Sequence, residues 1–331
     1  MQTQPEREAK RKAAEELIDA KVSQAIGIME ELGIDAWLIF AQEIGDGGDP
    51  AYPIVFGERD LGDGILLITR SGERVAVVGG LDVAIPGATP TWNRVVEHRG
   101  GWGPHLVELL KEFDPGSIAI NYSKSFRVAD GLSYGNYLRL VDALGGTPFV
   151  ERLTSAERLI ARLRTRKLPA EVDRIRAAIR VTDEIFAKLH EALRPGLTGR
   201  DIYHLVLDEV DRRGVGTAWS RYLCPIVTVG PVAPIGHTTP GDTPLERGWT
   251  LQVDFGVKAD GYCSDFQRMW YVLEKGEKRP PAEVVRLFDT VRKGIDTIIE
   301  HWGPGVPTWK CAEPTRRVLV DAGYPPYKYG L

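Results

Sequence analysis

The 331-residue sequence predicts a protein of two domains, an N-terminal α/β domain followed by a domain that contains an internal repeat. Three observations predict this organisation. Strand and helix patterns alternate through roughly the first 150 residues. A strongly charged, proline-containing segment follows at 151–174. Beyond it, one series of helix and turn signals occurs twice. We place the domain boundary near 160–168, which gives domains at 1–160 and 168–331.

Composition and charge exclude several protein classes. Hydrophobic residues make up 43% of the chain and charged residues 27%, which is ordinary for a globular protein. A net charge of −4 and an isoelectric point near 6.0 argue against a general nucleic-acid or anionic-membrane binder. No signal-peptide core and no apolar run of bilayer length occur. Three widely spaced cysteines indicate neither a disulfide framework nor a CxxC site, so we expect a cytoplasmic protein.

The N-terminal elements follow from apolar spacing and from turn residues. Gly33 provides a stop signal for the first helix, and a Ser-Gly turn separates two apolar runs. In order, the predicted elements are a helix at 8–32, a strand at 36–41, a loop at 42–62, two strands within 64–80, a helix at 104–113, a strand at 117–121 and a helix at 132–144.

The internal repeat aligns Pro195-Gly196-Leu197 with Pro304-Gly305-Val306. Each copy has the pattern of a helix, a Pro-Gly turn, a second helix and a glycine stop. The predicted helices are at 170–193 and 199–213 in the first copy, and at 284–302 and 308–322 in the second.

Only the first copy continues into a predicted strand, at 222–230. The second copy reaches Leu331 where its strands would begin, which would leave an apolar helical layer uncovered. We therefore expect the chain to be incomplete at its C-terminus and the 331 residues alone to be inactive. The alternative is that a divergent terminal helix ends the fold.

Two aspartates lie symmetrically about a predicted hairpin turn. Apolar and polar residues alternate at 251–255 and again at 262–266, which predicts two strands joined at 258–261. A hairpin centred between Ala259 and Asp260 pairs residue 254 with residue 265. Asp254 and Asp265 would then face each other, with Cβ atoms about 4.5–5.5 Å apart.

Directly opposed carboxylates repel each other, so the arrangement requires a proton or a cation. A divalent metal bound by carboxylate oxygens would fit the gap. The alternative is that a β-bulge turns one aspartate to solvent and nothing binds. On spacing alone, both alternatives remain open.

His237 lies in a Gly- and Pro-rich loop at 230–242, before the first aspartate strand. Loops on a rigid sheet often carry catalytic groups, and an imidazole could donate to a developing oxyanion. A lone loop histidine can equally be a plain surface residue. The segment 131–135 matches G-x-S-x-G, but the nearest predicted strand ends too early for a nucleophile elbow.

These residues resemble the creatinase and prolidase branch of the pita-bread metallopeptidases, which includes aminopeptidase P and methionine aminopeptidase. Family members carry a loop histidine, then D-x-G, then G-Y-x-S-D-x-x-R about ten residues on. The matching residues are His237, then Asp254-Phe255-Gly256, then Gly261-Tyr262-Cys263-Ser264-Asp265-Phe266-Gln267-Arg268. One departure is Gln267, which stands where the peptidases commonly have threonine.

The resemblance implies an α/β creatinase-like N-terminal domain and an α+β pita-bread domain, the latter incomplete at its C-terminus. It implies a site for two divalent metal ions held by five protein ligands. By analogy the ions are Mn²⁺ or Co²⁺, with Zn²⁺ as a further candidate. Asp254 and Asp265 match the first two ligands, and Asp265 is the bridging one. The remaining His and two Glu would lie beyond residue 331.

The resemblance further implies hydrolysis of Xaa-Pro bonds in short peptides by a homodimeric enzyme of the Xaa-Pro dipeptidase or aminopeptidase type. His237 would stabilise the tetrahedral intermediate or position the substrate. Two alternatives stay open. One is a creatinase-like amidinohydrolase acting on a small guanidino compound. The other is a catalytically silent pita-bread module that binds peptides or proteins without metal.

Overall fold

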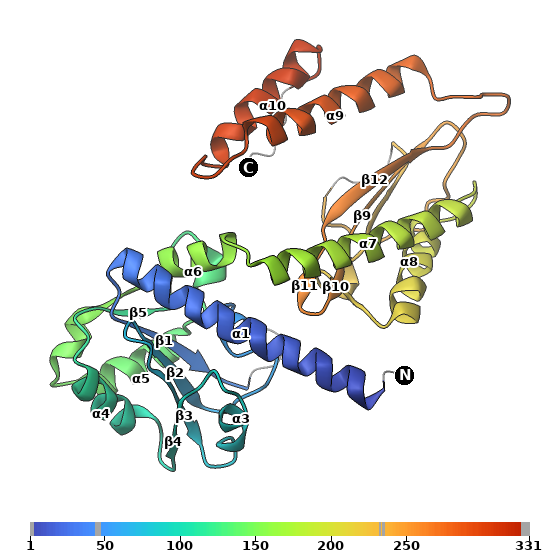
Figure 1. Ribbon diagram of the computed structural model, residues 1–331. Helices are drawn as coiled ribbons and strands as arrows, with labels where there is room; N and C mark the ends of the chain where they lie inside the picture. Colours follow the sequence, from blue (N-terminus) through green and yellow to red (C-terminus); the bar gives the residue numbers. More distant parts are fainter. Residues whose placement is uncertain (1–2, 44–47, 232, 234–235, 326–331) are drawn as a thin grey trace. The chain divides into compact units, whose positions relative to one another are not determined.

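A computed structural model describes residues 3–43, 48–231, 233 and 236–325 (Figure 1). The chain divides into two compact units, Met1–Val172 and Asp173–Leu331, which are described in turn. The division falls just inside helix α7 (Pro169–Ala192), within the charged segment 151–174 and a few residues after the boundary expected near 160–168.

The first unit is built on a six-stranded mixed sheet with strand order β4-β3-β2-β1-β5-β6. The predicted strand at 36–41, the strand pair within 64–80 and the three predicted helices are all confirmed, with small shifts at their ends. Strands β4 and β6, helix α6 and a short helix inside the predicted loop at 42–62 were not predicted. The elements are α1 (Gln4–Leu32), β1 (Ala36–Ala41), α2 (Tyr52–Val55), β2 (Gly64–Thr69), β3 (Arg74–Gly79), α3 (Ala84–Gly87), β4 (Arg94–His98), α4 (Gly103–Phe113), β5 (Ile118–Ile120), α5 (Tyr134–Leu144), β6 (Leu153–Ser155) and α6 (Glu157–Thr165).

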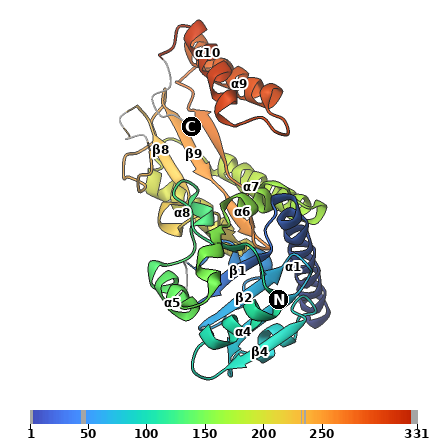
Figure 2. The ribbon, with the colours of Figure 1, turned by 90° about the vertical axis from the view of Figure 1, so that its left-hand side faces the viewer.

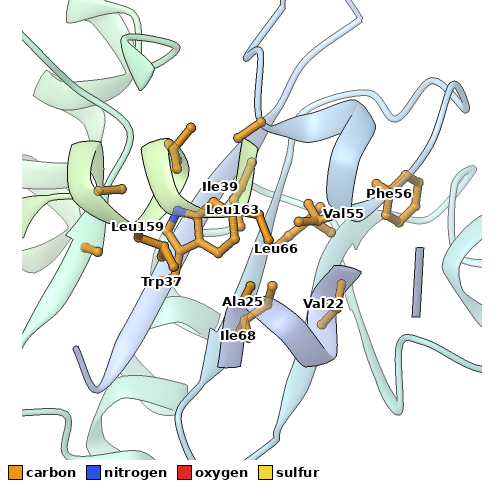
Figure 3. Close-up of a cluster of buried hydrophobic side chains, with 14 of the residues drawn as sticks. Val22, Ala25, Trp37, Ile39, Val55, Phe56, Leu66, Ile68, Leu159 and Leu163 are labelled. Carbon is orange, nitrogen blue, oxygen red and sulfur yellow. The ribbon is translucent and has the colours of Figure 1, made fainter. Parts of the chain in front are cut away.

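Helices cover both faces of this sheet, which explains why its central strands are apolar throughout. Along β1, Trp37 and Ile39 join a core with α1 and α6, whereas Leu38 and Phe40 join a second core with α4 and α5. Figure 2 shows α1 and α5 on opposite sides of the sheet. Figure 3 shows the first core, in which Leu163 of α6 packs close to Trp37.

A buried polar chain runs through the first unit. Asn121 accepts a 2.6 Å hydrogen bond from the Trp37 indole and donates one of 2.7 Å to Asp49 Oδ2. The Ala51 backbone N–H donates to Asp49 Oδ1 at 2.9 Å. Burial raises the pKa of Asp49 to about 6, although both hydrogen bonds oppose the rise. A Cβ atom on Gly131 would lie 2.3 Å from Asp49 Cγ, so only glycine fits beside this carboxyl group.

The second unit contains two three-stranded sheets, β12-β9-β8 and β11-β10-β7. All four predicted helices of the repeat are present. Of the predicted strand at 222–230, only β8 forms, because residues 221–223 make a 3₁₀ turn. The elements are α8 (Gly199–Arg213), β7 (Gly216–Thr217), β8 (Ile226–Val229), β9 (Thr250–Phe255), β10 (Val257–Ala259), β11 (Tyr262–Cys263), β12 (Phe266–Tyr271), α9 (Ala282–His301) and α10 (Trp309–Asp321).

Only one face of sheet β12-β9-β8 joins a hydrophobic core with α7 and α8 (Figure 1). Leu251, Val253 and Phe255 of β9 are fully buried in that core, whereas the residues between them are only half-buried. This alternation follows from the two-residue period of a strand. Gln252 and Asp254 therefore lie on the other face of the sheet.

Helices α9 and α10 pack against each other. Gly294 of α9 lies close to the Thr315 side chain of α10, because a Cβ atom there would be only 3.2 Å from Thr315 Cγ2. Large apolar side chains on α9, among them Phe288, Ile295 and Ile299, are exposed. The incompleteness expected for the chain stays a prediction. In the part of the chain that the structure describes, no helix is long and apolar enough to cross a bilayer.

The raised pKa of Asp49 gives a pH dependence that can be measured. A carboxyl group whose pKa is higher in the folded than in the unfolded state takes up a proton on folding below that pKa. Its contribution to stability is complete below about pH 4 and is lost as the pH rises through about 6. We expect the unfolding free energy of the wild type to gain about 1 kcal/mol over that of Asp49→Asn when the pH falls from 7 to 5. Urea titrations at both pH values measure the difference, and parallel changes in the two proteins would contradict it.

Candidate metal site

The turn of the hairpin lies one residue later than expected. Ala259 pairs with Tyr262, so the two turn residues are Asp260 and Gly261. Their φ angles are 49° and 80°, as a type I′ turn requires. Asp and Gly tolerate positive φ far better than Ala259 would, which is why the centre predicted between Ala259 and Asp260 is wrong.

The corrected register changes the partner of Asp254. Asp254 pairs with Gln267 across β9 and β12, not with Asp265 as predicted. Asp265 lies directly before β12 and is close enough to Asp254 for its charge to raise the pKa of Asp254. The expected proximity of the two aspartates holds, but their direct opposition does not.

Ser264 and Gly256 fix the part of the hairpin that lies between the two sheets. The Ser264 side chain is buried, accepts a 3.0 Å hydrogen bond from the Val257 N–H and pairs with the Thr182 hydroxyl of α7 at 2.6 Å. A Cβ atom on Gly256 would lie 1.9 Å from the Ser264 carbonyl oxygen. The Gly of the D-x-G segment and the Ser before Asp265 therefore set the backbone that carries both aspartates.

Asp254 is half-buried, and its two oxygens have different surroundings. Oδ2 accepts a 3.1 Å hydrogen bond from the Gln267 amide. Oδ1 is buried and has no hydrogen-bond partner among the described residues. Burial raises the pKa of Asp254, and the charge of Asp265 adds to that rise. The Gln267 hydrogen bond and the charge of His237 act in the opposite direction.

The structure brings the three predicted site residues together to different degrees. Asp265 lies close enough to Asp254 to raise the pKa of Asp254. Asp265 is exposed, as is His237 in its loop. His237 is close enough to Asp254 for its charge to lower the pKa of Asp254, and its role in the site stays a prediction.

The donor chemistry fits a divalent cation in part. The Asp265 carboxylate lies near that of Asp254, and one Asp254 oxygen is buried without a hydrogen-bond partner among the described residues. Oxygen donors of this kind suit hard divalent ions. Within residues 3–43, 48–231, 233 and 236–325, no group of three or more His, Cys, Asp and Glu side chains is placed to hold a metal ion. Asp254 and Asp265 can therefore form part of a metal site.

Sequence reasoning missed the polar neighbours of Asp254. Gln252 Nε2 donates to Gln267 Oε1 at 2.5 Å, and Gln267 in turn donates to Asp254. The Asp-Gly pair at 260–261 was the available signal, because an Asp-Gly turn sets the register that places Gln267 opposite Asp254.

Two further polar side chains outside the hairpin, Ser133 and His190, make structural contacts. Ser133, from the G-x-S-x-G match, caps helix α5 by accepting from the Asn136 N–H at 3.2 Å. His190 accepts a 3.0 Å hydrogen bond from the Trp270 indole. All three cysteines are free.

Residues 173–331 match metallopeptidase family M24, and this range coincides with the second compact unit. The second unit is thus similar to metallopeptidase family M24. An uncharacterized peptidase of Staphylococcus saprophyticus is 26% identical over 262 residues, which cover 79% of this chain and 69% of that protein.

Two solved structures have the same fold over almost the whole chain. The Xaa-Pro dipeptidase from Bacillus anthracis superposes with a TM-score of 0.71 at 19% identity, covering 93% of this chain and 78% of that one. The X-Pro aminopeptidase from Thermotoga maritima gives a TM-score of 0.69 at 21% identity, covering 89% and 78%. At these identities the likeness establishes the fold, which for the second unit is that of the pita-bread metallopeptidases.

Gly256 offers a direct test of the hairpin geometry. We expect Gly256→Ala to lower the free energy of unfolding by about 3 kcal/mol, because the new methyl group would overlap a backbone oxygen that cannot move away. Gly216→Ala on β7 is the matched control, since its Cβ would meet its nearest neighbour at an ordinary 3.6 Å. Urea denaturation of both variants gives the comparison. Equal losses would show that the close approach does not constrain the hairpin.

Proposed function

We propose that the protein is a metal-dependent peptidase that hydrolyses Xaa-Pro bonds in short peptides. The observation that carries this proposal is the proximity of Asp254 and Asp265 on the hairpin, with a buried oxygen of Asp254 left without a partner among the described residues. Because residues 173–331 match metallopeptidase family M24, that arrangement is best explained as part of a metal centre.

Asp254 and Asp265 would be metal ligands. From the family resemblance, we propose that they help to bind two divalent ions, Mn²⁺, Co²⁺ or Zn²⁺. Such ions supply a Lewis acid and a water made nucleophilic at neutral pH. His237 would donate a hydrogen bond to the scissile carbonyl oxygen and stabilise the charge that develops on it. Its exposed loop position leaves the imidazole accessible to a substrate on the open face of the sheet.

The substrate class rests on the relatives. The structures with the same fold are described as an Xaa-Pro dipeptidase and an X-Pro aminopeptidase, and the Staphylococcus relative is described as a peptidase. A short peptide with proline after the scissile bond is therefore the substrate to test first. The creatinase-like amidinohydrolase and the silent binding module remain the alternatives.

The localisation, oligomeric state and domain organisation of the protein are also proposed from the resemblance. We propose a cytoplasmic homodimer with a creatinase-like N-terminal domain at 1–160 and a pita-bread domain at 168–331. Three free cysteines fit a reducing compartment. Neither nucleic acid nor a membrane is expected as a partner of a chain with a net charge of −4.

Activity assays distinguish the three functions. For protein expressed from the complete reading frame, we expect an Xaa-Pro dipeptide or an Xaa-Pro-Yaa tripeptide to be cleaved with Mn²⁺ or Co²⁺ and not after removal of metal by EDTA. Asp265→Asn should abolish cleavage, whereas Asp208→Asn on the exposed side of α8 should not. Turnover of creatine alone would favour the amidinohydrolase. Peptide binding without turnover, unchanged by EDTA, would favour the binding module.

A second assay isolates His237. We expect His237→Ala to lower kcat on an Xaa-Pro peptide by about 10²–10³, the loss typical of one oxyanion donor. His204→Ala on helix α8 is a control that leaves the hairpin and its loop untouched. Unchanged turnover by the His237 variant would remove this residue from the mechanism.

A further inference from the structure

We infer that Gln267 is a positioning residue that holds the Asp254 carboxylate with Oδ1 turned toward the cation. The inference rests on the proposed function, since it requires a metal ion at Asp254. It adds a residue that touches neither metal nor substrate and acts only through the carboxylate it orients.

The backbone places Gln267 for this task. Gln267 is the direct cross-strand partner of Asp254, so their side chains leave the same face of the sheet side by side. The Gln267 amide nitrogen lies 3.1 Å from Asp254 Oδ2 and donates to it. With Oδ2 engaged in this way, Oδ1 is the oxygen that remains buried and without a partner among the described side chains and backbone.

A second glutamine decides which end of the Gln267 amide faces the carboxylate. Gln252 precedes Asp254 by two residues on β9 and therefore shares its face. Gln252 Nε2 donates to Gln267 Oε1 at 2.5 Å. Because an amide oxygen only accepts and an amide nitrogen only donates, this contact leaves the Gln267 nitrogen to point at Asp254. The three side chains form an ordered relay from Gln252 through Gln267 to Asp254.

Hydrogen bonds to the far oxygen of a metal-binding group fix its orientation, and their loss typically lowers metal affinity 10–100-fold. Gln267 is itself exposed, so its substitution leaves the hydrophobic core intact. A loss of metal affinity without a loss of stability is therefore the signature of this role.

The experiment is a Co²⁺ titration of the protein from the complete reading frame, followed by the visible absorption of the bound ion. We expect Gln267→Met, which keeps the length of the side chain and removes the donor, to weaken Co²⁺ binding about 10-fold. The absorption band should shift as well, because the coordination geometry changes. Gln267→Thr restores a hydroxyl donor and should bind within about threefold of the wild type.

Met269→Leu is the matched control, since Met269 lies two residues further along β12, opposite Gln252, and makes none of the hydrogen bonds of the relay. It should leave both the affinity and the spectrum unchanged, and the melting temperatures of the metal-free variants should agree. Unaltered Co²⁺ binding by Gln267→Met would overturn the inference alone. Equal weakening in the Met and Thr variants would also overturn it, because the donor would then be irrelevant. Failure of the unsubstituted protein to bind Co²⁺ would overturn the proposed function and this inference together.

Discussion

The register of one β-hairpin is the constraint on which the candidate site depends. Two consecutive residues with positive φ, Asp260 and Gly261, close the hairpin as a type I′ turn, and every cross-strand pair of β9 and β12 follows from that closure. A shift of one residue in either strand would move Asp254 to the core face, where Leu251, Val253 and Phe255 now pack. The turn therefore decides which side chains meet on the open face of the sheet.

The hairpin is also tied to the helical layer. The Ser264 hydroxyl bridges the Val257 N–H and the Thr182 hydroxyl, so the segment that carries Asp265 is joined to helix α7 by a buried polar contact. An unmade hydrogen bond at a buried hydroxyl costs about 1–3 kcal/mol, which makes this contact specific as well as stabilising. Gly256 complements it, since any side chain there would overlap the Ser264 carbonyl oxygen. The residues around the aspartates thus set the shape of the site, and the aspartates supply its charge.

The sequence predicted much of this fold because its strongest signals are local. The apolar strand β1 and the helix ending at Gly33 need no tertiary information, whereas the short polar strand β6 forms only because β5 offers it a partner. For the site, the predicted strand pair placed Asp254 close to Asp265 even though the turn was misplaced. The partner of Asp254 needs the true register, so Gln267 was noticed as a departure from the family pattern and not as a neighbour. A register error of two residues leaves each side chain on the correct face of the sheet, but it assigns the wrong cross-strand partner.

The two Asp254 carboxylate oxygens differ in their hydrogen bonding, and this difference is the strongest structural indication of a function for the hairpin. Folding ordinarily gives buried acceptors a donor, and Asp49 in the first unit has one for each oxygen. Asp254 has a donor for Oδ2 only, and its neighbour Asp265 repels the charged form. A hairpin selected for stability alone would place an amide or an apolar side chain at residue 254. The carboxylate is kept there against repulsion, with Oδ2 bound by Gln267 and Oδ1 buried without a donor among the described residues, and a bound cation would stabilise its charged form. In the proposed metal site, the same feature that weakens the metal-free hairpin would favour binding of a divalent ion.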